Sequence, residues 1–219
     1  MDFFIDTANL DQIREAQELG ILDGVTTNPS LMAKEGIYGT DNVHDHYRKI
    51  CSLVTGPVSA EVISTGKEEM VTEGIALFNL NPAQIVVKIP MTENGLAAIK
   101  KLKEIKIPTN CTLIFSVSQA LLAAKAGATY VSPFVGRLDD ISSDGIQLIN
   151  QIRQVFDNYQ LDALILAASI RNTRHIIDCA EIGSDVVTAP LKVFKMLIKH
   201  PLTDAGLQKF LDDYNALKP

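Results

Sequence analysis

The sequence predicts an α/β fold, a single (β/α)8 TIM barrel with an extra C-terminal helix, and three observations support this. Eight short apolar runs recur along the 219 residues, and each is followed by a segment with helical periodicity. The runs start roughly 20–35 residues apart, the length of one strand and its crossover helix. Barrels of this class commonly form one domain of about this size, so we expect residues 1–219 to be a single domain.

The eight apolar runs are expected to form parallel strands that are buried on both faces. Residues 84–88 (Gln-Ile-Val-Val-Lys) and 163–166 (Ala-Leu-Ile-Leu) are examples with an apolar interior. Strands covered by helices on both sides have this composition. The predicted strands span residues 3–6, 24–27, 58–63, 84–88, 108–114, 129–133, 163–168 and 186–188.

Helical periodicity marks the segments between the strands. Leu10, Ile13 and Leu19 share one face of a predicted helix that ends at Gly20. Alternating strands and helices also fit an open, doubly wound sheet. That fold predicts a glycine-rich phosphate-binding turn after the first strand, where residues 6–9 read Asp-Thr-Ala-Asn, so the closed barrel is favoured.

Residues 203–217 lie beyond the eighth strand and helix. Their apolar side chains recur at helical spacing, which predicts the additional C-terminal helix. Two interpretations stay open at this point. The helix covers one end of the barrel, or it is a docking element at a subunit interface.

Composition limits the partners of the protein. The formal net charge of −6 argues against nucleic acid and anionic membranes as partners. The three cysteines have no metal-binding spacing and are expected to be reduced thiols in a cytoplasmic protein. No signal-peptide pattern follows Met1, and no apolar stretch reaches the length of a membrane span.

Polar residues stand at or just after the ends of the predicted strands, and a parallel barrel brings all these ends to one face. They are Asp6, Thr26, Asn28, Glu61, Lys88, Asn110, Thr112, Ser132, Arg137, Ser169 and Arg171. We therefore expect one ring that combines an amine, carboxylates, hydroxyls, amides and guanidinium groups.

Lys88 is the most informative member of this ring. It directly follows three apolar residues, 85–87, so its stem should begin inside the barrel, where burial disfavours the ammonium form and favours an amine nucleophile. The alternative is a strand-end lysine that reaches solvent, and the surrounding polar ring favours the nucleophile. Asp6 and Glu61 are candidate proton carriers for carbonyl chemistry, or else partners of Lys88 in an ion pair alone.

Arg137 and Arg171 offer forked donors for a phosphate, with the Ser169 hydroxyl beside them, and the alternative is surface solvation. His44 and His46 are the only other pair with ligand character. Their spacing places the two rings apart on a helix and on opposite faces of a strand, so we expect no metal site.

At these residues the sequence resembles the transaldolase family, in its short microbial subfamily, from Phe3 to about Pro201. The most specific stretches are residues 26–30 (Thr-Thr-Asn-Pro-Ser) and residues 110–116 (Asn-Cys-Thr-Leu-Ile-Phe-Ser). Residues 4–8, 24–31, 86–90, 132–137 and 168–172 also match the pattern of the family.

The resemblance implies a cofactor-free transfer of a dihydroxyacetone unit in the pentose phosphate pathway. The donor would be sedoheptulose 7-phosphate or fructose 6-phosphate, and the acceptor an aldose phosphate such as erythrose 4-phosphate. Carried over by motif, Lys88 forms the Schiff base, Asp6 handles the proton of the C4 hydroxyl, and Glu61 with Thr112 holds the catalytic water. The residues implied in substrate binding are Thr26, Asn28, Asn110 and Ser132 for hydroxyls, and Arg137, Ser169 and Arg171 for the phosphate.

The related fructose-6-phosphate aldolase, which releases free dihydroxyacetone, is the alternative within this resemblance. In its pattern Gln stands at the position of Glu61 and Tyr at that of Phe134, a residue expected to contact substrate. Both residues here match transaldolase. Ile170 departs from the larger transaldolases, which usually have Phe there, and this affects packing more than chemistry. The family often assembles as pentamers or decamers, so the resemblance also implies a homo-oligomer.

Overall fold

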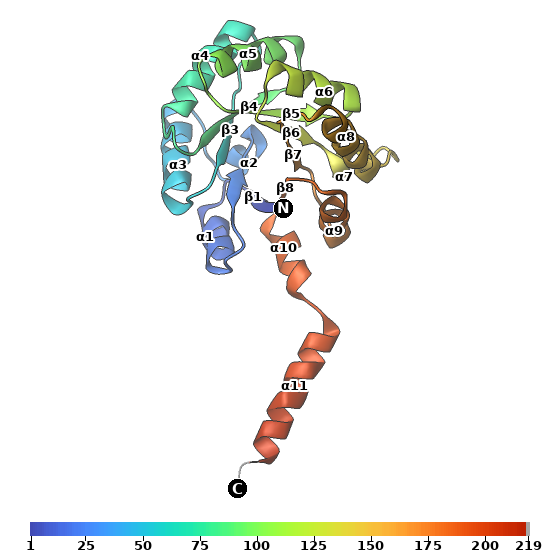
Figure 1. Ribbon diagram of the computed structural model, residues 1–219. Helices are drawn as coiled ribbons and strands as arrows, with labels where there is room; N and C mark the ends of the chain where they lie inside the picture. The colour runs from blue at the N-terminus through green and yellow to red at the C-terminus, as the bar shows by residue number, and fades with distance from the viewer. Residues whose placement is uncertain (218–219) are drawn as a thin grey trace.

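A computed structural model, which describes residues 1–217, shows a closed barrel of eight parallel strands surrounded by helices (Figure 1). The strands are β1 (Asp2–Asp6), β2 (Gly24–Thr26), β3 (Val58–Glu61), β4 (Ile85–Pro90), β5 (Thr109–Ile114), β6 (Tyr130–Pro133), β7 (Leu164–Ala167) and β8 (Val186–Ala189). The helices are α1 (Leu10–Glu18), α2 (Pro29–Lys34), α3 (Thr40–Leu53), α4 (Lys67–Phe78), α5 (Glu93–Glu104), α6 (Val117–Ala126), α7 (Val135–Asp139), α8 (Gly145–Tyr159), α9 (Thr173–Ile182), α10 (Leu191–Ile198) and α11 (Pro201–Ala216).

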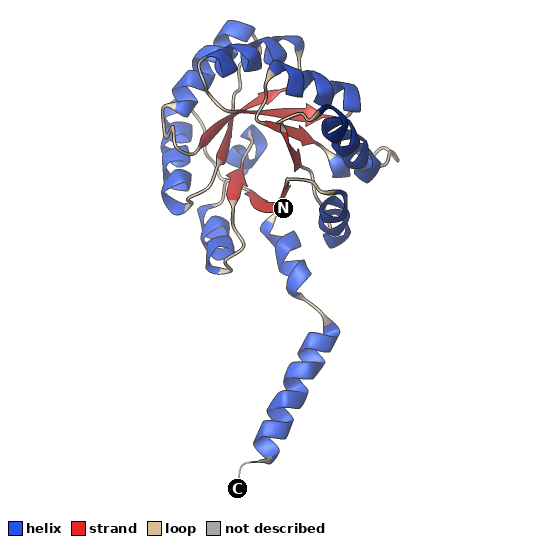
Figure 2. Cartoon of the chain, in the orientation of Figure 1, coloured by secondary structure: helices blue, strands red, loops and turns tan. Residues whose placement is uncertain are grey.

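The strands follow one another around the barrel in sequence order, and β8 pairs with β1 to close it. Figure 2 shows the strands at the centre with the helices outside them. The predicted α/β barrel is therefore confirmed. Each strand begins within one residue of its predicted start and ends within two residues of its predicted end.

Side-chain caps fix where the helices begin after the strands. Asn9, Asn28, Ser116 and Asn172 each accept a hydrogen bond from a backbone N–H in the first turn of the following helix. Such caps satisfy donors that have no partner inside the helix. The loops above the carboxyl ends of the strands are consequently short and held in place.

The barrel interior is divided into an apolar layer and a polar layer. Five buried side chains pack together inside the barrel, nearer the amino ends of the strands than the polar residues, and we call them the barrel floor: Phe4, Val86, Tyr130, Leu166 and Val186. Successive side chains on a strand point to opposite faces, so the residue two positions further along faces the same interior. Those residues include Asp6, Lys88 and Ser132, which places them directly above the floor.

The C-terminal helix predicted at residues 203–217 is present as α11. Figure 1 shows it extending away from the barrel, so the interpretation that it covers one end of the barrel is wrong. The chain turns outward between α10 and α11, and Pro201 occupies the first turn of α11, where its missing N–H is tolerated. No residue of α11 up to Ala216 is buried. Within residues 1–217, no helix is long and apolar enough to cross a membrane.

The barrel floor generates a stability prediction. Phe4 is 1% exposed, so Phe4→Ala should leave a cavity and lower the free energy of unfolding by about 3–5 kcal/mol. Urea denaturation followed by circular dichroism measures this change. Ile141→Ala is the control, because Ile141 is 72% exposed and its truncation should change stability by less than about 0.5 kcal/mol. Equal effects of the two substitutions would contradict the assignment of Phe4 to the core.

Candidate functional site

A cavity of about 330 Å³ opens at the carboxyl ends of the barrel strands. Ten of the twelve residues predicted from the sequence line it: Asp6, Thr26, Asn28, Glu61, Lys88, Thr112, Ser132, Phe134, Arg137 and Ser169. Asn110 lies beneath the lining and Arg171 beyond it. The convergence of parallel strand ends therefore collects most of the candidate residues in one place.

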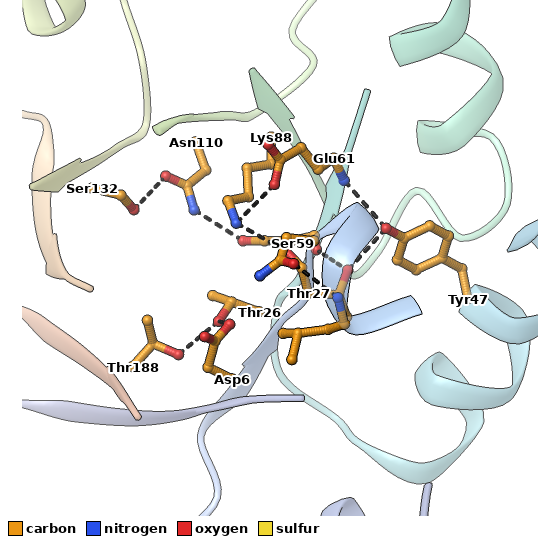
Figure 3. Close-up of polar contacts among 12 residues, drawn as sticks. Asp6, Thr26, Thr27, Tyr47, Ser59, Glu61, Lys88, Asn110, Ser132 and Thr188 are labelled. Atoms are coloured by element: carbon orange, nitrogen blue, oxygen red, sulfur yellow. Dashed lines mark hydrogen bonds and ion pairs between the residues drawn. The ribbon is translucent and has the colours of Figure 1, made fainter. Parts of the chain in front are cut away.

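Lys88 lies at the centre of this cavity, and its side chain is buried. The residue is 6% exposed, so the interpretation of a lysine that reaches bulk solvent is wrong. Its Nζ lies 3.0 Å from Oε2 of Glu61 and donates a hydrogen bond of 2.8 Å to the carbonyl of Thr27 (Figure 3). Glu61 faces Lys88 because the two residues are paired in the register of β3 and β4. A buried amine held by a carboxylate and a carbonyl can act as an oriented nucleophile.

Asp6 belongs to a second hydrogen-bonded group, with Thr26 and Thr188, which lies apart from the pair of Lys88 and Glu61 (Figure 3). The Thr26 hydroxyl donates to Asp6 at 2.8 Å and lies 2.6 Å from the Thr188 hydroxyl, which therefore donates to Thr26. Burial raises the pKa of the Asp6 carboxyl, and the charge of Lys88 and the bond from Thr26 partly offset this. A carboxyl with a raised pKa suits proton transfer near neutral pH.

Asn110 and Ser132 connect three strands across the site. Ser132 donates to Oδ1 of Asn110 at 2.8 Å, and Nδ2 of Asn110 donates to the Ser59 hydroxyl at 3.1 Å. Asn110 is fully buried, so it supports the lining instead of forming part of it. Thr112 follows on the same face of β5, and its hydroxyl is buried without a protein partner among residues 1–217.

The cationic side of the cavity is formed by residues after β6 and β7. Arg137 on α7 stacks its guanidinium 4.9 Å above the ring of Phe134, and this orients the side chain at the cavity. Arg171 behaves differently. Its side chain is 49% exposed, and its guanidinium forms a two-pronged ion pair with Asp140. Its role in phosphate binding stays a prediction, because a phosphate would have to compete with Asp140 for the same donors.

Two cavity-lining residues have backbone conformations that are unfavourable for any residue except glycine. Leu113 has φ 60° and Ser169 has φ 59°, both in the left-handed region. Such strain persists only where the surrounding structure imposes it, and it concentrates at functional sites. At Leu113 it accompanies the shift in register between β5 and β6. No sequence signal marked either residue as strained.

Cys111 and His46 are buried near the site and make contacts that stabilise the fold. Cys111 lies between Asn110 and Thr112 on β5 and therefore points to the opposite face, where its Sγ lies 3.8 Å from Sδ of Met91. Burial raises its pKa to about 12, so little of the nucleophilic thiolate is present. His46 is buried with Nε2 2.7 Å from the carbonyl of Ala8. In the described part of the chain, no group of three or more His, Cys, Asp or Glu side chains could hold a metal ion.

The sequence reasoning missed several polar residues at the site. Thr188 stands one residue before the end of β8 and is the last residue of the predicted strand 186–188, so the strand-end criterion that found Lys88 would have found it too. Thr27 contributes a backbone carbonyl, and Ser59 and Tyr47 contribute hydroxyls from below and outside the cavity. Thr27 stands in the predicted strand end and in the Thr-Thr-Asn-Pro-Ser stretch, but nothing local assigned a role to its carbonyl. Ser59 and Tyr47 carry no local signal, because their roles depend on contacts between segments that are distant in the sequence.

The raised pKa of Asp6 generates a prediction on stability. The pKa of Asp6 is higher in the folded state than in the unfolded state. The carboxyl therefore contributes to stability at pH values below its unfolded-state pKa, and this contribution is lost as the pH rises through its folded-state pKa. Because burial disfavours ionisation of Asp6, the carboxyl makes the fold less stable at pH 7 than near pH 4. Asp6→Asn should raise the midpoint of urea denaturation at pH 7, with a smaller gain near pH 4. Asp162→Asn, in an exposed loop, is the control and should change little at either pH. A constant gain at both pH values would contradict the prediction.

Comparisons with known proteins place the chain in a family. Residues 3–218 match the family described as transaldolase/fructose-6-phosphate aldolase. A probable transaldolase of Parabacteroides distasonis is 65% identical over 214 residues, which are 98% of each chain. Probable transaldolases of Phocaeicola vulgatus and Cytophaga hutchinsonii are 64% and 63% identical, also over 98% of each chain. A match of this extent includes the whole barrel and every residue of the site, and the chain therefore belongs to the transaldolase/fructose-6-phosphate aldolase family.

Proposed function

We propose that this protein is a transaldolase that transfers a dihydroxyacetone unit from a ketose phosphate to an aldose phosphate through a Schiff base at Lys88. The observation that carries the proposal is the buried amine of Lys88, held between Glu61 and the Thr27 carbonyl at the centre of the cavity. Sedoheptulose 7-phosphate and fructose 6-phosphate are the proposed donors, as in the pentose phosphate pathway. The protein residues alone supply the groups that the proposed steps use.

In the first step, Nζ of Lys88 attacks the C2 carbonyl of the ketose, and the carbinolamine loses water to give an iminium. This step needs a group that moves protons between nitrogen, oxygen and water. Glu61 is placed for it, with Oε2 3.0 Å from Nζ. The buried Thr112 hydroxyl lines the same cavity, and a water molecule there would provide it with a hydrogen-bond partner.

In the second step, Asp6 accepts the proton of the C4 hydroxyl and the C3–C4 bond breaks. The bonding electrons move into the iminium, which becomes an enamine, and the aldose phosphate leaves. Burial raises the pKa of Asp6, which increases its basicity toward the hydroxyl proton. Thr26 and Thr188 hold the carboxylate in place through their hydrogen bonds. Addition of an acceptor aldehyde reverses these steps and completes the transfer.

The fate of the enamine distinguishes transfer from simple cleavage. A transferase must delay hydrolysis of the Lys88 adduct until an acceptor arrives. Glu61 and Phe134 stand where the aldolase pattern has Gln and Tyr, and the Phe134 ring packs between Phe115 and the guanidinium of Arg137. It brings no hydroxyl into the cavity that could relay a proton to water. These two residues favour transferase over aldolase activity.

The substrate phosphate is proposed to bind at Arg137 and Ser169, which line the cavity after β6 and β7. A guanidinium offers paired donors that match phosphate oxygens. Ser169 lines the cavity beside it. The hydroxyls of the sugar are proposed to contact Thr26, Asn28 and Ser132, which line the same cavity above the buried Asn110.

We further propose that the protein is a homo-oligomer in which α11 contacts a neighbouring subunit. The helix projects from the barrel (Figure 1), and Leu207 and Phe210 are 59% and 71% exposed. Large apolar side chains that gather on one exposed element commonly mark an interaction surface.

Reductive trapping tests the Schiff base. Borohydride added with fructose 6-phosphate should attach a three-carbon or six-carbon adduct to Lys88, located by peptide mass spectrometry. Lys88→Met should abolish the adduct and lower transfer activity by roughly a thousandfold or more, because the nucleophile is lost. Lys101→Met is the matched control, since Lys101 lies half-exposed on α5 outside the cavity lining and its loss should leave the adduct intact.

Two results would contradict the proposal. An adduct on another lysine would show that Lys88 is not the nucleophile. Turnover of fructose 6-phosphate that is independent of added erythrose 4-phosphate, with release of free dihydroxyacetone, would identify an aldolase.

Substitution of Arg137 tests the phosphate site. Arg137→Ala should raise the KM for fructose 6-phosphate by about 10–100-fold, the effect of losing charged hydrogen bonds. The KM for fructose, which has no phosphate, should change little. Arg174→Ala, on the exposed face of α9, is the control and should leave both constants unchanged. An equal rise for both sugars would show that Arg137 does not act on the phosphate.

A further inference from the structure

The hydrogen-bond ladder between β2 and β3 is interrupted at the active lysine. In a parallel pair, donors and acceptors alternate regularly between the strands. Val25 donates to Pro57, and two residues later Thr27 donates to Ser59. In a regular ladder, the next bond would join the N–H of Glu61, two residues after Ser59 on β3, to the carbonyl of Thr27.

That next bond is replaced by two others. The Thr27 carbonyl accepts the hydrogen bond from Nζ of Lys88 at 2.8 Å. The Glu61 N–H donates instead to the hydroxyl of Tyr47 at 3.2 Å. The Thr27 carbonyl thus points to the lysine, and the Tyr47 hydroxyl, from outside the barrel, takes its place as the acceptor for the Glu61 N–H (Figure 3).

Tyr47 lies on α3 and is 2% exposed, so its hydroxyl is fixed by packing and does not exchange with bulk water. The Thr27 hydroxyl lies 2.9 Å from the Tyr47 hydroxyl and donates its own proton to the Ser59 carbonyl. Tyr47 must therefore donate to Thr27 while it accepts from Glu61. Burial also raises the pKa of Tyr47 to about 12, which keeps this proton in place. Each proton in the chain of bonds has one defined direction.

We propose that Tyr47 is a positioning residue for the Schiff-base lysine: its hydroxyl replaces the missing ladder acceptor, and so holds Glu61 and the Thr27 carbonyl in the places where both contact Lys88. The proposal rests on the proposed function for the chemistry of Lys88. Without the Tyr47 hydroxyl, the Glu61 N–H has the Thr27 carbonyl as its nearest alternative. Closure of that bond turns the carbonyl into the sheet and away from the amine.

Tyr47→Phe tests this, because it removes the hydroxyl and keeps the ring that packs in the core. We expect kcat for transfer to fall by about tenfold or more with KM within about threefold, since misplacement of the nucleophile affects the reaction more than binding.

A second readout needs no sugar substrate. 2,4-Pentanedione forms an ultraviolet-absorbing enaminone with a reactive amine, and its rate of reaction at Lys88 should fall by about as much as kcat. Tyr130→Phe, in the barrel floor, is the matched control and should leave both rates within about twofold of the parent.

The outcomes are distinct. A folded Tyr47→Phe protein that labels Lys88 at the parental rate would overturn the proposal, even if its melting temperature is lower. If that variant does not fold, Thr27→Val removes the acceptor of the Tyr47 proton, together with the hydrogen bond that the Thr27 hydroxyl donates to the Ser59 carbonyl, and keeps the Thr27 carbonyl. It should slow labelling in the same direction, and an unchanged rate would overturn the proposal. A parent protein that labels at Lys88 but shows no sugar transfer would contradict the proposed function and leave the positioning test valid. A parent that does not label at Lys88 would overturn both.

Discussion

The Lys88 amine is buried inside an apolar barrel and still held in a defined orientation, and under the proposed function most of the structure around it serves that requirement. The barrel floor excludes water from below, because Val86 lies two residues before Lys88 on the same face of β4. Glu61 and the Thr27 carbonyl replace the lost hydration with two fixed partners. Such compensation is needed because a buried polar group without partners destabilises the fold.

Much of the fold and most of the site could be predicted from the sequence, for a physical reason. Parallel strands buried on both faces form continuous apolar runs, so β4 and β7 were visible as segments. Barrel closure then places every strand end on one face, so Asp6 and Lys88 could be brought together without any knowledge of long-range contacts. The resemblance to transaldolases supplied roles for these residues, which geometry alone would leave open.

What could not be predicted depends on contacts between distant segments. The pairing of Arg171 with Asp140 joins the loops after β7 and α7, and neither residue has a neighbour in sequence that signals it. The hydroxyl of Tyr47 reaches the site from α3. The apolar residues three and four positions after Tyr47 in this helix, Ile50 and Cys51, suggest only that Tyr47 packs in the core. The outward course of α11 is set by two residues between helices, and helical periodicity carries no information about direction.

The barrel floor has a consequence for the order of events in catalysis. Because it fills the barrel below Lys88, the cavity of about 330 Å³ has a single mouth, at the carboxyl ends of the strands. For a transferase this means that the aldose released from the first ketose leaves by the route along which the second aldose enters. Under the proposed function both aldoses bind their phosphate at Arg137 and Ser169, so they would occupy this subsite in turn. A barrel that is closed at one end, combined with the proposed covalent adduct on Lys88, thus favours kinetics of alternating substitution, with parallel lines in double-reciprocal plots.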